Sequence, residues 1–166
     1  MPLCMLEYEG FPFFEDHPLP DKVIIYSDGG CKPNPGIGGY AALLIYGEHQ
    51  REISGGAKAT TNNQMELTAA IEALNALTRP CEVEFYTDSQ YLRKGITEWI
   101  AKWQKNGWMT AEKKPVLNQE LWQRLYQLSQ IHDIHWKWTR GHAGNVYNER
   151  VDQLATQARE QIRQSR

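Results

Sequence analysis

The chain has 166 residues, of which 41% are hydrophobic and 23% are charged, and its formal net charge is −2. This length and apolar content suit one globular domain with a substantial core. The charge balance excludes a polycationic nucleic-acid-binding protein, and no apolar run approaches the roughly 20 residues that a membrane-spanning helix needs. The N-terminus lacks a basic stretch followed by an apolar one, so the sequence predicts neither a signal peptide nor a membrane partner.

The average charge hides one basic segment, which runs from Arg93 to Lys114. It contains six basic residues and two acidic ones, which leaves it with a net charge of +4. Such a segment can bind phosphate groups even on a slightly acidic protein. It also contains Trp99, Trp103 and Trp108. Core packing is the usual role of tryptophan, but aromatic rings among lysines also fit a groove for nucleic acid.

The cysteines exclude two further kinds of site. Cys4, Cys31 and Cys81 are odd in number and form neither a CxxC pair nor a Cys/His pattern, which argues against a zinc site and against a disulfide framework. Free thiols fit a reducing compartment, so the sequence predicts a cytoplasmic protein.

The chain divides into a short arm and one domain. Residues 1–21 mix aromatic and acidic side chains with prolines, which argue against a helix or a central strand. We expect this N-terminal extension to lie on the domain as an arm or to be partly disordered. Residues 22–163 form a single α/β domain, and residues 164–166 are a short C-terminal end.

The domain begins with a strand, Val23–Asp28, whose Val, Ile and Tyr residues are typical of a position inside a sheet. Gly29 and Gly30 follow and should let the backbone turn sharply away. Residues 32–39 then predict a rigid loop. The loop is glycine-rich but lacks the Gly-Lys-Ser/Thr ending of a phosphate-binding P-loop, so nucleotide binding is not expected there.

The next strands, Tyr40–Tyr46 and Arg51–Gly55, complete an antiparallel meander. A helix over Thr61–Leu77 follows, in which Thr61 and Gln64 have the spacing of a capping box. A strand that follows a crossover helix is usually parallel to an earlier one. The remaining predicted elements are strands over 82–88 and 134–139 and helices over 89–105, 118–130 and about 145–162.

Two aspartates end strands that should run parallel to each other. Asp28 ends the first strand and Asp88 ends the fourth, and open α/β sheets place their ligand sites at the edge where such strands end. A lone aspartate there is most often a helix cap or a turn residue. Two of them at matched places favour a shared site.

Two helical acids could join this site. Glu66 lies in the first turns of its helix, where a glutamate is often a surface charge that favours the helix dipole, and Asp152 lies at the boundary of the buried face of the last helix. Three or four converging acids would repel one another unless a cation joined them, and oxygen-only ligands favour Mg²⁺ or Mn²⁺ over zinc. Two such ions about 4 Å apart can activate a water and stabilise a leaving oxygen in phosphodiester hydrolysis.

Other polar residues flank these acids. His142 lies between glycine-rich neighbours shortly before Asp152; a lone histidine is usually incidental, but beside a metal site it can carry protons near neutral pH. Amides at turns and helix starts are normally caps, yet they can also bond base edges and the ribose 2′-hydroxyl that distinguishes RNA from DNA. The amides concerned are Asn34, Asn62, Asn63 and Gln90.

The ordered set of motifs resembles bacterial ribonuclease HI, and the likeness runs from about Lys22 to Arg159. The motifs are Ser27-Asp-Gly-Gly-Cys, Asn34-Pro-Gly, Gly38-Gly-Tyr, Thr61-Asn-Asn-Gln-Met-Glu-Leu, Thr87-Asp-Ser-Gln-Tyr, Gly107-Trp-Met-Thr, Lys113-Lys-Pro, Arg140-Gly-His-Ala-Gly and Asn148-Glu-Arg-Val-Asp.

The resemblance implies a ribonuclease H-like α/β fold, with a five-stranded mixed sheet whose first three strands are antiparallel and whose later strands are parallel, flanked by helices. It implies an endoribonuclease that uses two metal ions to cut the RNA strand of RNA–DNA hybrids, leaving 5′-phosphate and 3′-hydroxyl ends. The cofactor would be Mg²⁺, one or two ions per site, with Mn²⁺ able to substitute. The partner would be the hybrid, and the protein would be a monomer with no obligate protein partner.

Residue roles are also implied by the resemblance. Metal ligands would be Asp28, Glu66, Asp88 and Asp152, and His142 would assist proton transfer or product release. The hybrid minor groove would be read by Asn34, Asn62, Asn63 and Gln90, with the backbone near Cys31. Thr61 and Asn118 would hold a DNA-strand phosphate, and Trp99 and Trp103, with the basic segment, would grip the DNA strand.

One departure and two alternatives remain. The basic segment has fewer basic residues than the family pattern, which should reduce the salt-sensitive part of binding. A hybrid-binding module without catalysis would need one of the acids to be missing, and none is. A 3′–5′ exonuclease of the same broad fold usually shows Asp-x-Glu on the first strand, whereas Asp28 is followed by two glycines.

Overall fold

The computed structural model describes residues 22–139 and 145–165. The predicted N-terminal arm and the loop that carries His142 lie outside these ranges. None of the helices within them is long and apolar enough to cross a membrane.

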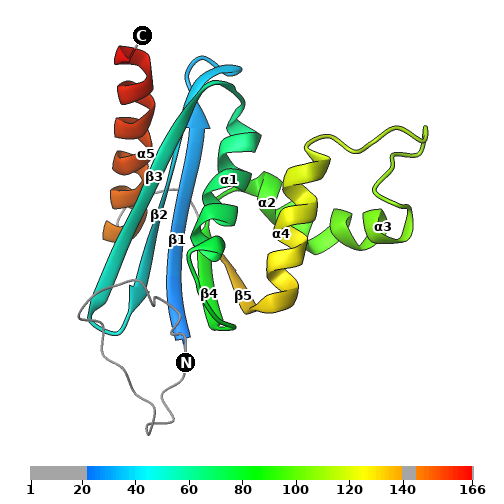
Figure 1. Cartoon of the computed structure of the whole chain (residues 1–166), viewed down its shortest axis with the longest axis horizontal. Helices are drawn as coiled ribbons and strands as arrows, with labels where there is room; N and C mark the ends of the chain where they lie inside the picture. The colour runs from blue at the N-terminus through cyan, green and yellow to red at the C-terminus, as the bar shows by residue number, and fades with distance from the viewer. Residues whose placement is uncertain (1–21, 140–144, 166) are drawn as a thin grey trace, which may run out of the picture.

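A five-stranded mixed sheet forms the centre of the molecule (Figure 1), in the order β3-β2-β1-β4-β5. The central strand β1 pairs antiparallel with β2 and parallel with β4, and β4 pairs parallel with β5. The predicted mixed sheet is therefore confirmed. The strands are β1 (Lys22–Cys31), β2 (Gly36–Tyr46), β3 (His49–Thr60), β4 (Glu82–Thr87) and β5 (Asp133–Trp138).

Helices cover both faces of the sheet and bury two separate cores. The larger core packs α1 and α4 against residues such as Ile25 and Phe85, and the smaller core packs α5 against Tyr26 and Leu43. Successive residues of β1 thus face opposite layers, as the two-residue period of a strand requires. The helices are α1 (Asn62–Asn75), α2 (Gln90–Lys94), the π-helical turn η1 (Gly95–Trp99), α3 (Ile100–Lys105), α4 (Gln119–Ile131) and α5 (Val146–Gln164).

The predicted break at the two glycines is wrong. Gly29 and Gly30 continue β1 and pair with Tyr40 and Gly39 of β2. The connection that the sequence predicted over 32–39 shrinks to residues 32–35, because the glycines that follow are paired in the sheet. Glycine content predicted a turn here, but strand pairing keeps the backbone extended.

The absence of a side chain at Gly29 has a different purpose, which is to admit helix α1. A Cβ atom on Gly29 would lie 2.5 Å from the backbone carbonyl of Met65 and 2.9 Å from the backbone nitrogen of Glu66. Backbone atoms cannot rotate aside as a side-chain tip can, so α1 approaches β1 this closely only over glycine. The contact places the start of α1, with Glu66, directly against the strand that carries Asp28.

Helix α5 makes a matching contact on the opposite face. A Cβ atom on Gly39 of β2 would lie 2.2 Å from the carbonyl oxygen of Ala155 and 2.7 Å from the backbone nitrogen of Arg159. In the pairing of β1 with β2, Asp28 lies opposite Ala41 and Gly30 lies opposite Gly39. Residues two apart on a strand face the same side of the sheet, so the Asp28 side chain lies on the same face as Gly39. The helix that carries Asp152 is therefore held close to the strand that carries Asp28.

The predicted helix starts are confirmed with one change. Thr61 caps α1, and its hydroxyl accepts a hydrogen bond of 3.1 Å from the backbone nitrogen of Gln64. The side-chain oxygen of Gln64 does not complete the capping box, because it accepts a bond of 2.9 Å from the Thr60 hydroxyl instead. The helix predicted over 89–105 is present as the consecutive segments α2, η1 and α3.

The cysteine prediction is only partly correct. Cys31 is a free thiol, as expected. Cys81 is buried and forms a disulfide, so the expectation of free thiols throughout the chain is wrong.

Replacing Gly29 with Ala should destabilise the fold, because the methyl group would force α1 away from β1. Overpacking of this kind costs about 1–3 kcal/mol, and we expect the melting temperature to fall by several degrees. The measurement is thermal unfolding followed by circular dichroism.

The matched control is Gly47→Asn. Gly47 has a φ of +58°, and nothing lies within 4 Å of the position that a Cβ atom would take there. Asparagine tolerates this backbone conformation, so the melting temperature should stay close to that of the wild type. An unchanged melting temperature in Gly29→Ala would show that close approach of α1 is not required.

Candidate active site

The four predicted acids come from four elements and converge on one edge of the sheet. Asp28 lies near the end of the central strand β1, and Asp88 directly follows the neighbouring strand β4. Glu66 lies in the second turn of α1 on one face, and Asp152 lies in the second turn of α5 on the other. The arrangement was inferred from strand direction for the two aspartates, but nothing in the sequence placed the two helical acids.

Asp28 and Asp152 form the first pair. Their side chains share a hydrogen bond, which requires that one carboxyl be protonated. Burial is the main cause that raises the pKa of Asp28 to about 8, and the bond to Asp152 and the negative charges of Asp88 and Asp152 raise it further. Asp28 therefore favours its neutral form in the absence of a cation.

Glu66 and Ser89 form the second pair. The Ser89 hydroxyl donates a hydrogen bond of 2.8 Å to Oε1 of Glu66, and it also accepts one of 3.1 Å from the backbone nitrogen of Leu92 as the cap of α2. Burial raises the pKa of Glu66 to about 7, the bond from Ser89 opposes this shift, and the charge of Asp88 adds to it. The bond from Ser89 to a site carboxylate had no signal in the sequence.

Asp88 connects the two pairs, since its negative charge raises the pKa of both Asp28 and Glu66. Within the described ranges, no three His, Cys, Asp or Glu side chains are arranged closely enough to hold a metal ion as they stand. The carboxyls are instead paired with each other and with Ser89. Carboxyls with raised pKa values and mutual repulsion nevertheless fit a divalent cation, because a cation would replace the shared proton and offset the repulsion.

A cavity of about 150 Å³ opens beside the first pair. Its floor is glycine backbone from β1 and β2, and its walls come from α5. Because the glycines have no side chains, a phosphodiester backbone could approach the carboxylates closely here. The lining residues are Asp28, Gly29, Gly30, Gly39, Asp152, Ala155, Thr156 and Arg159.

The start of α5 is anchored by residues that the sequence did not single out. The Asn145 side chain caps the helix by accepting hydrogen bonds of 2.9 and 3.1 Å from the backbone nitrogens of Tyr147 and Asn148. The same side chain is hydrogen-bonded to the hydroxyl of Tyr26 on β1. Arg150 adds a two-pronged ion pair to Glu52 of β3, with bonds of 2.6 and 3.0 Å. These contacts fix the helix just before Asp152.

Three of the predicted minor-groove residues lie together at the end of β1. The backbone nitrogen of Cys31 donates a 2.6 Å bond to Oδ1 of Asn62, and the backbone nitrogen of Asn62 donates a 3.0 Å bond to Oδ1 of Asn34. The two amide oxygens thus join the end of β1 and the 32–35 turn to the start of α1. Asn63 is half-buried beside Asn62, and Gln90 is exposed at the start of α2.

The predicted phosphate pocket contains a third residue, Gln64. Its backbone nitrogen donates to the Thr61 hydroxyl, and its side-chain nitrogen donates a 3.2 Å bond to Oδ1 of Asn118. Gln64 also lines two cavities, of about 410 and 350 Å³, one shared with Thr61 and one shared with Asn118. From the sequence Gln64 was expected only as part of a capping box, and nothing there indicated that it lies between the other two residues.

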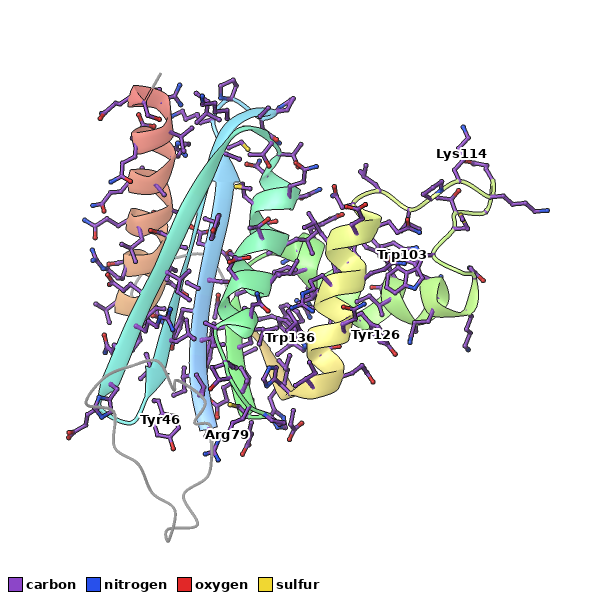
Figure 2. All side chains as sticks on the ribbon, in the orientation of Figure 1. Tyr46, Arg79, Trp103, Lys114, Tyr126 and Trp136 are labelled. Atoms are coloured by element: carbon purple, nitrogen blue, oxygen red, sulfur yellow. The ribbon has the colours of Figure 1, made fainter. Side chains whose placement is uncertain are left out.

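The basic segment projects from the domain on the side away from α5 (Figure 1). Lys114 lies at the tip of its loop, whereas Trp103 lies inward toward α4 (Figure 2). The Trp103 ring is 5.7 Å from that of Trp99 and 5.6 Å from that of buried Trp122. Packing is therefore the main role of these indoles. His142, the remaining predicted site residue, lies outside the described residues.

The sheet order and the acids at its edge define a hydrolase of ribonuclease H-like fold. The family model described as RNase H matches residues 20–160. A ribonuclease H of Halorhodospira halophila is 58% identical over 137 residues, which cover 82% of this chain and 92% of that protein. The chain belongs to the RNase H family of endoribonucleases.

Solved structures agree with this assignment. LC9-RNase H1, described as a type 1 RNase H with the type 2 active-site motif, is 33% identical, with a TM-score of 0.76 over 88% of this chain and 75% of that one. LC11-RNase H1, solved in complex with an RNA/DNA hybrid, is 22% identical, with a TM-score of 0.61 over 84% of this chain and 98% of that one. The second likeness supports the fold alone.

The raised pKa of Asp28 predicts how stability changes with pH in the metal-free protein. The folded state holds this proton up to about pH 8, whereas an unfolded aspartate releases it near pH 3.9. Stability should therefore fall as the pH rises from about 4 to about 8. In EDTA at pH 8, Asp28→Asn should melt at least about 3 °C above the wild type, and the difference should shrink toward pH 4.

Asp133→Asn is the control, because Asp133 is an exposed carboxylate at the start of β5. Its melting temperature should differ little from that of the wild type at either pH. If Asp28→Asn showed the same small difference at pH 4 and pH 8, Asp28 would not be a buried, proton-holding group.

Proposed function

We propose that this protein hydrolyses the RNA strand of RNA–DNA hybrids with two Mg²⁺ ions, leaving 5′-phosphate and 3′-hydroxyl ends. As a member of the RNase H family it acts on hybrids as a ribonuclease H. The observation that carries the metal-dependent mechanism is the set of four acids at one sheet edge, of which Asp28 and Glu66 are half-buried and have raised pKa values.

The metal ligands in this proposal are Asp28, Glu66, Asp88 and Asp152. Oxygen-only ligands favour Mg²⁺, one or two ions per site, and Mn²⁺ can take its place. Ions held by these residues would supply an activated water and would stabilise the leaving oxygen. The bond from Ser89 fixes the Glu66 carboxylate. His142 assists proton transfer or product release near neutral pH.

Substrate recognition in this proposal uses the residues around the acids. The half-buried amides of Asn62 and Asn63, with Asn34 and Gln90, face the minor groove, where the 2′-hydroxyl distinguishes the RNA strand. The backbone at Cys31 contributes beside them. Thr61 and Asn118, joined by Gln64, hold a phosphate of the DNA strand. Trp99 and Trp103 support the basic segment against the same strand.

The cellular setting follows from the bacterial resemblance and from the chemistry of the substrate. We place the protein in the cytoplasm, where hybrids form, as a monomer with no obligate protein partner. The cysteines no longer support this placement, because Cys81 is in a disulfide. Residues 22–163 are proposed as the catalytic domain.

The decisive experiment compares three substrates of one sequence: an RNA–DNA hybrid, duplex RNA and duplex DNA, each with Mg²⁺ and with EDTA. We expect cleavage of the RNA strand of the hybrid alone, and only with Mg²⁺. Asp28→Asn should lower the rate by at least about 1,000-fold, because it removes a ligand on which catalysis depends.

The control variant is again Asp133→Asn, which should retain the wild-type rate. End analysis of the products, by ligation or phosphatase sensitivity, should reveal 5′-phosphates. Cleavage of the hybrid in EDTA, or near-normal activity of Asp28→Asn, would refute the proposed mechanism.

A further inference from the structure

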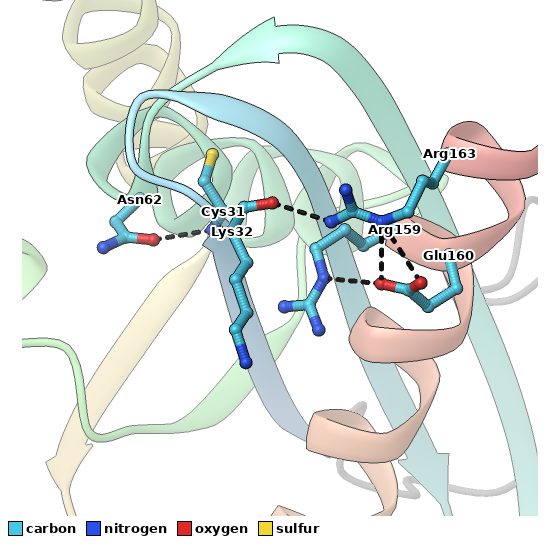
Figure 3. A network of polar contacts seen from close by, with 6 residues as sticks. All are labelled: Cys31, Lys32, Asn62, Arg159, Glu160 and Arg163. Atoms are coloured by element: carbon cyan, nitrogen blue, oxygen red, sulfur yellow. Dashed lines mark hydrogen bonds and ion pairs between the residues drawn. The ribbon is translucent and has the colours of Figure 1, made fainter.

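A group of basic side chains lies at the corner where β1 ends and α5 passes (Figure 3). It consists of Lys32, which directly follows β1, and of Arg159 and Arg163 from the last turns of α5. We call these three residues the basic corner. It is distinct from the basic segment over 93–114, which projects on the other side of the sheet (Figure 1).

The basic corner is held together by specific bonds. Arg163 donates a 2.7 Å bond from Nη2 to the backbone oxygen of Lys32, which ties α5 to the turn after β1. The Nε atoms of Arg159 and Arg163 each donate a 3.2 Å bond to the carboxylate of Glu160. One carboxylate thus orients two guanidinium groups, and the corner retains a net charge of +2.

The basic corner adjoins the catalytic carboxylates. Arg159 lines the same cavity of about 150 Å³ as Asp28 and Asp152. Its backbone is fixed there, because α5 packs on Gly39 with no room for a Cβ atom. Burial raises the pKa of the Cys31 thiol, and the positive charge of Arg159 opposes that shift. The guanidinium is therefore close enough to influence a group at the end of β1 electrostatically. The cavity has acids at one end and a cation at the other.

We propose that Arg159 and Lys32 bind a backbone phosphate of the hybrid beside the bond that is cut, with Glu160 and Arg163 as positioning residues. This inference rests on the proposed function. A guanidinium matches phosphate oxygens in geometry and charge, and Arg159 lines the same cavity as the acids that the scissile phosphate would reach. The competing explanation is a surface ion-pair cluster that only ties the end of α5 to the sheet, a role worth little free energy.

The test uses the full chain and two variants, Lys32→Gln and Arg159→Gln. Lys32 is exposed, and its bond in the corner is made by its backbone oxygen, so Lys32→Gln should fold normally. In Mg²⁺ we expect each variant to raise KM for the hybrid roughly 10-fold at low salt, with kcat within about twofold of wild type. The slope of log affinity against log salt should fall by about 1 for each variant.

Arg124→Gln is the control, because it removes one positive charge from an exposed arginine on α4, which packs on the opposite face of the sheet from α5. It should leave KM and the salt slope unchanged. Equal losses of affinity in Arg124→Gln and Arg159→Gln would show that the effect comes from overall charge, and would overturn the inference. A wild-type KM and a wild-type salt slope in both Lys32→Gln and Arg159→Gln would also overturn the inference. That result would mean that the basic corner only ties the end of α5 to the sheet.

A binding measurement that does not depend on cleavage separates failure of the phosphate site from failure of the proposed function. Affinity for the hybrid is also measured in EDTA by fluorescence anisotropy, and thermal unfolding checks that each variant is folded. If the wild type cleaved no hybrid, the proposed function would fail, while a weaker affinity of Lys32→Gln and a smaller salt slope would still support the phosphate site. If the wild type cleaved but the variants bound like it, only the phosphate site would fail.

Discussion

The contact between α1 and β1 at Gly29 is the constraint on which the site depends. The backbone of Met65 lies where a side chain of residue 29 would be, and the contact of α5 at Gly39 repeats this on the other face. Any larger residue would push one helix outward by the size of a methyl group or more. Since Glu66 and Asp152 reach the site only from those helices, the distance between the acids is set by these two positions rather than by the acids themselves.

Bringing the acids together opposes folding. Burial and mutual repulsion raise the pKa values of Asp28 and Glu66, so the metal-free site holds protons that an unfolded chain would release at neutral pH. The two cores stabilise the fold against this repulsion: one layer buries α1 and α4, and the other buries α5. A cation would offset the repulsion directly. Without a cation the site thus lowers its negative charge by holding protons, and binding of a metal ion would release them.

The sequence predicted those parts of the fold that depend on periodicity. The strand β5, the helix α1 and the parallel course of β1 and β4 were all predicted from the sequence, and all are confirmed. What the sequence could not reveal are contacts between distant segments. Gly29 looked like a turn because glycine favours turns, and only the position of Met65, 36 residues away along the chain, shows that it is a contact surface. The roles of Ser89 and Gln64 were missed for the same reason, since each depends on a partner supplied by another element.

The charges of the molecule form a pattern that its net charge of −2 conceals. Acids occupy the centre of one sheet edge, the basic segment projects beyond α4 on one side, and Lys32, Arg159 and Arg163 lie on the other side next to α5 (Figures 1 and 3). A duplex laid across this edge would meet cations on both flanks and carboxylates in the middle. The basic segment has fewer positive charges than the resemblance led us to expect, and its indoles are engaged in packing. The basic corner beside the acids compensates for the missing charge of the basic segment. A phosphate that is held next to the reacting bond restricts the scissile group directly. A contact with the distant basic segment restricts only the duplex as a whole.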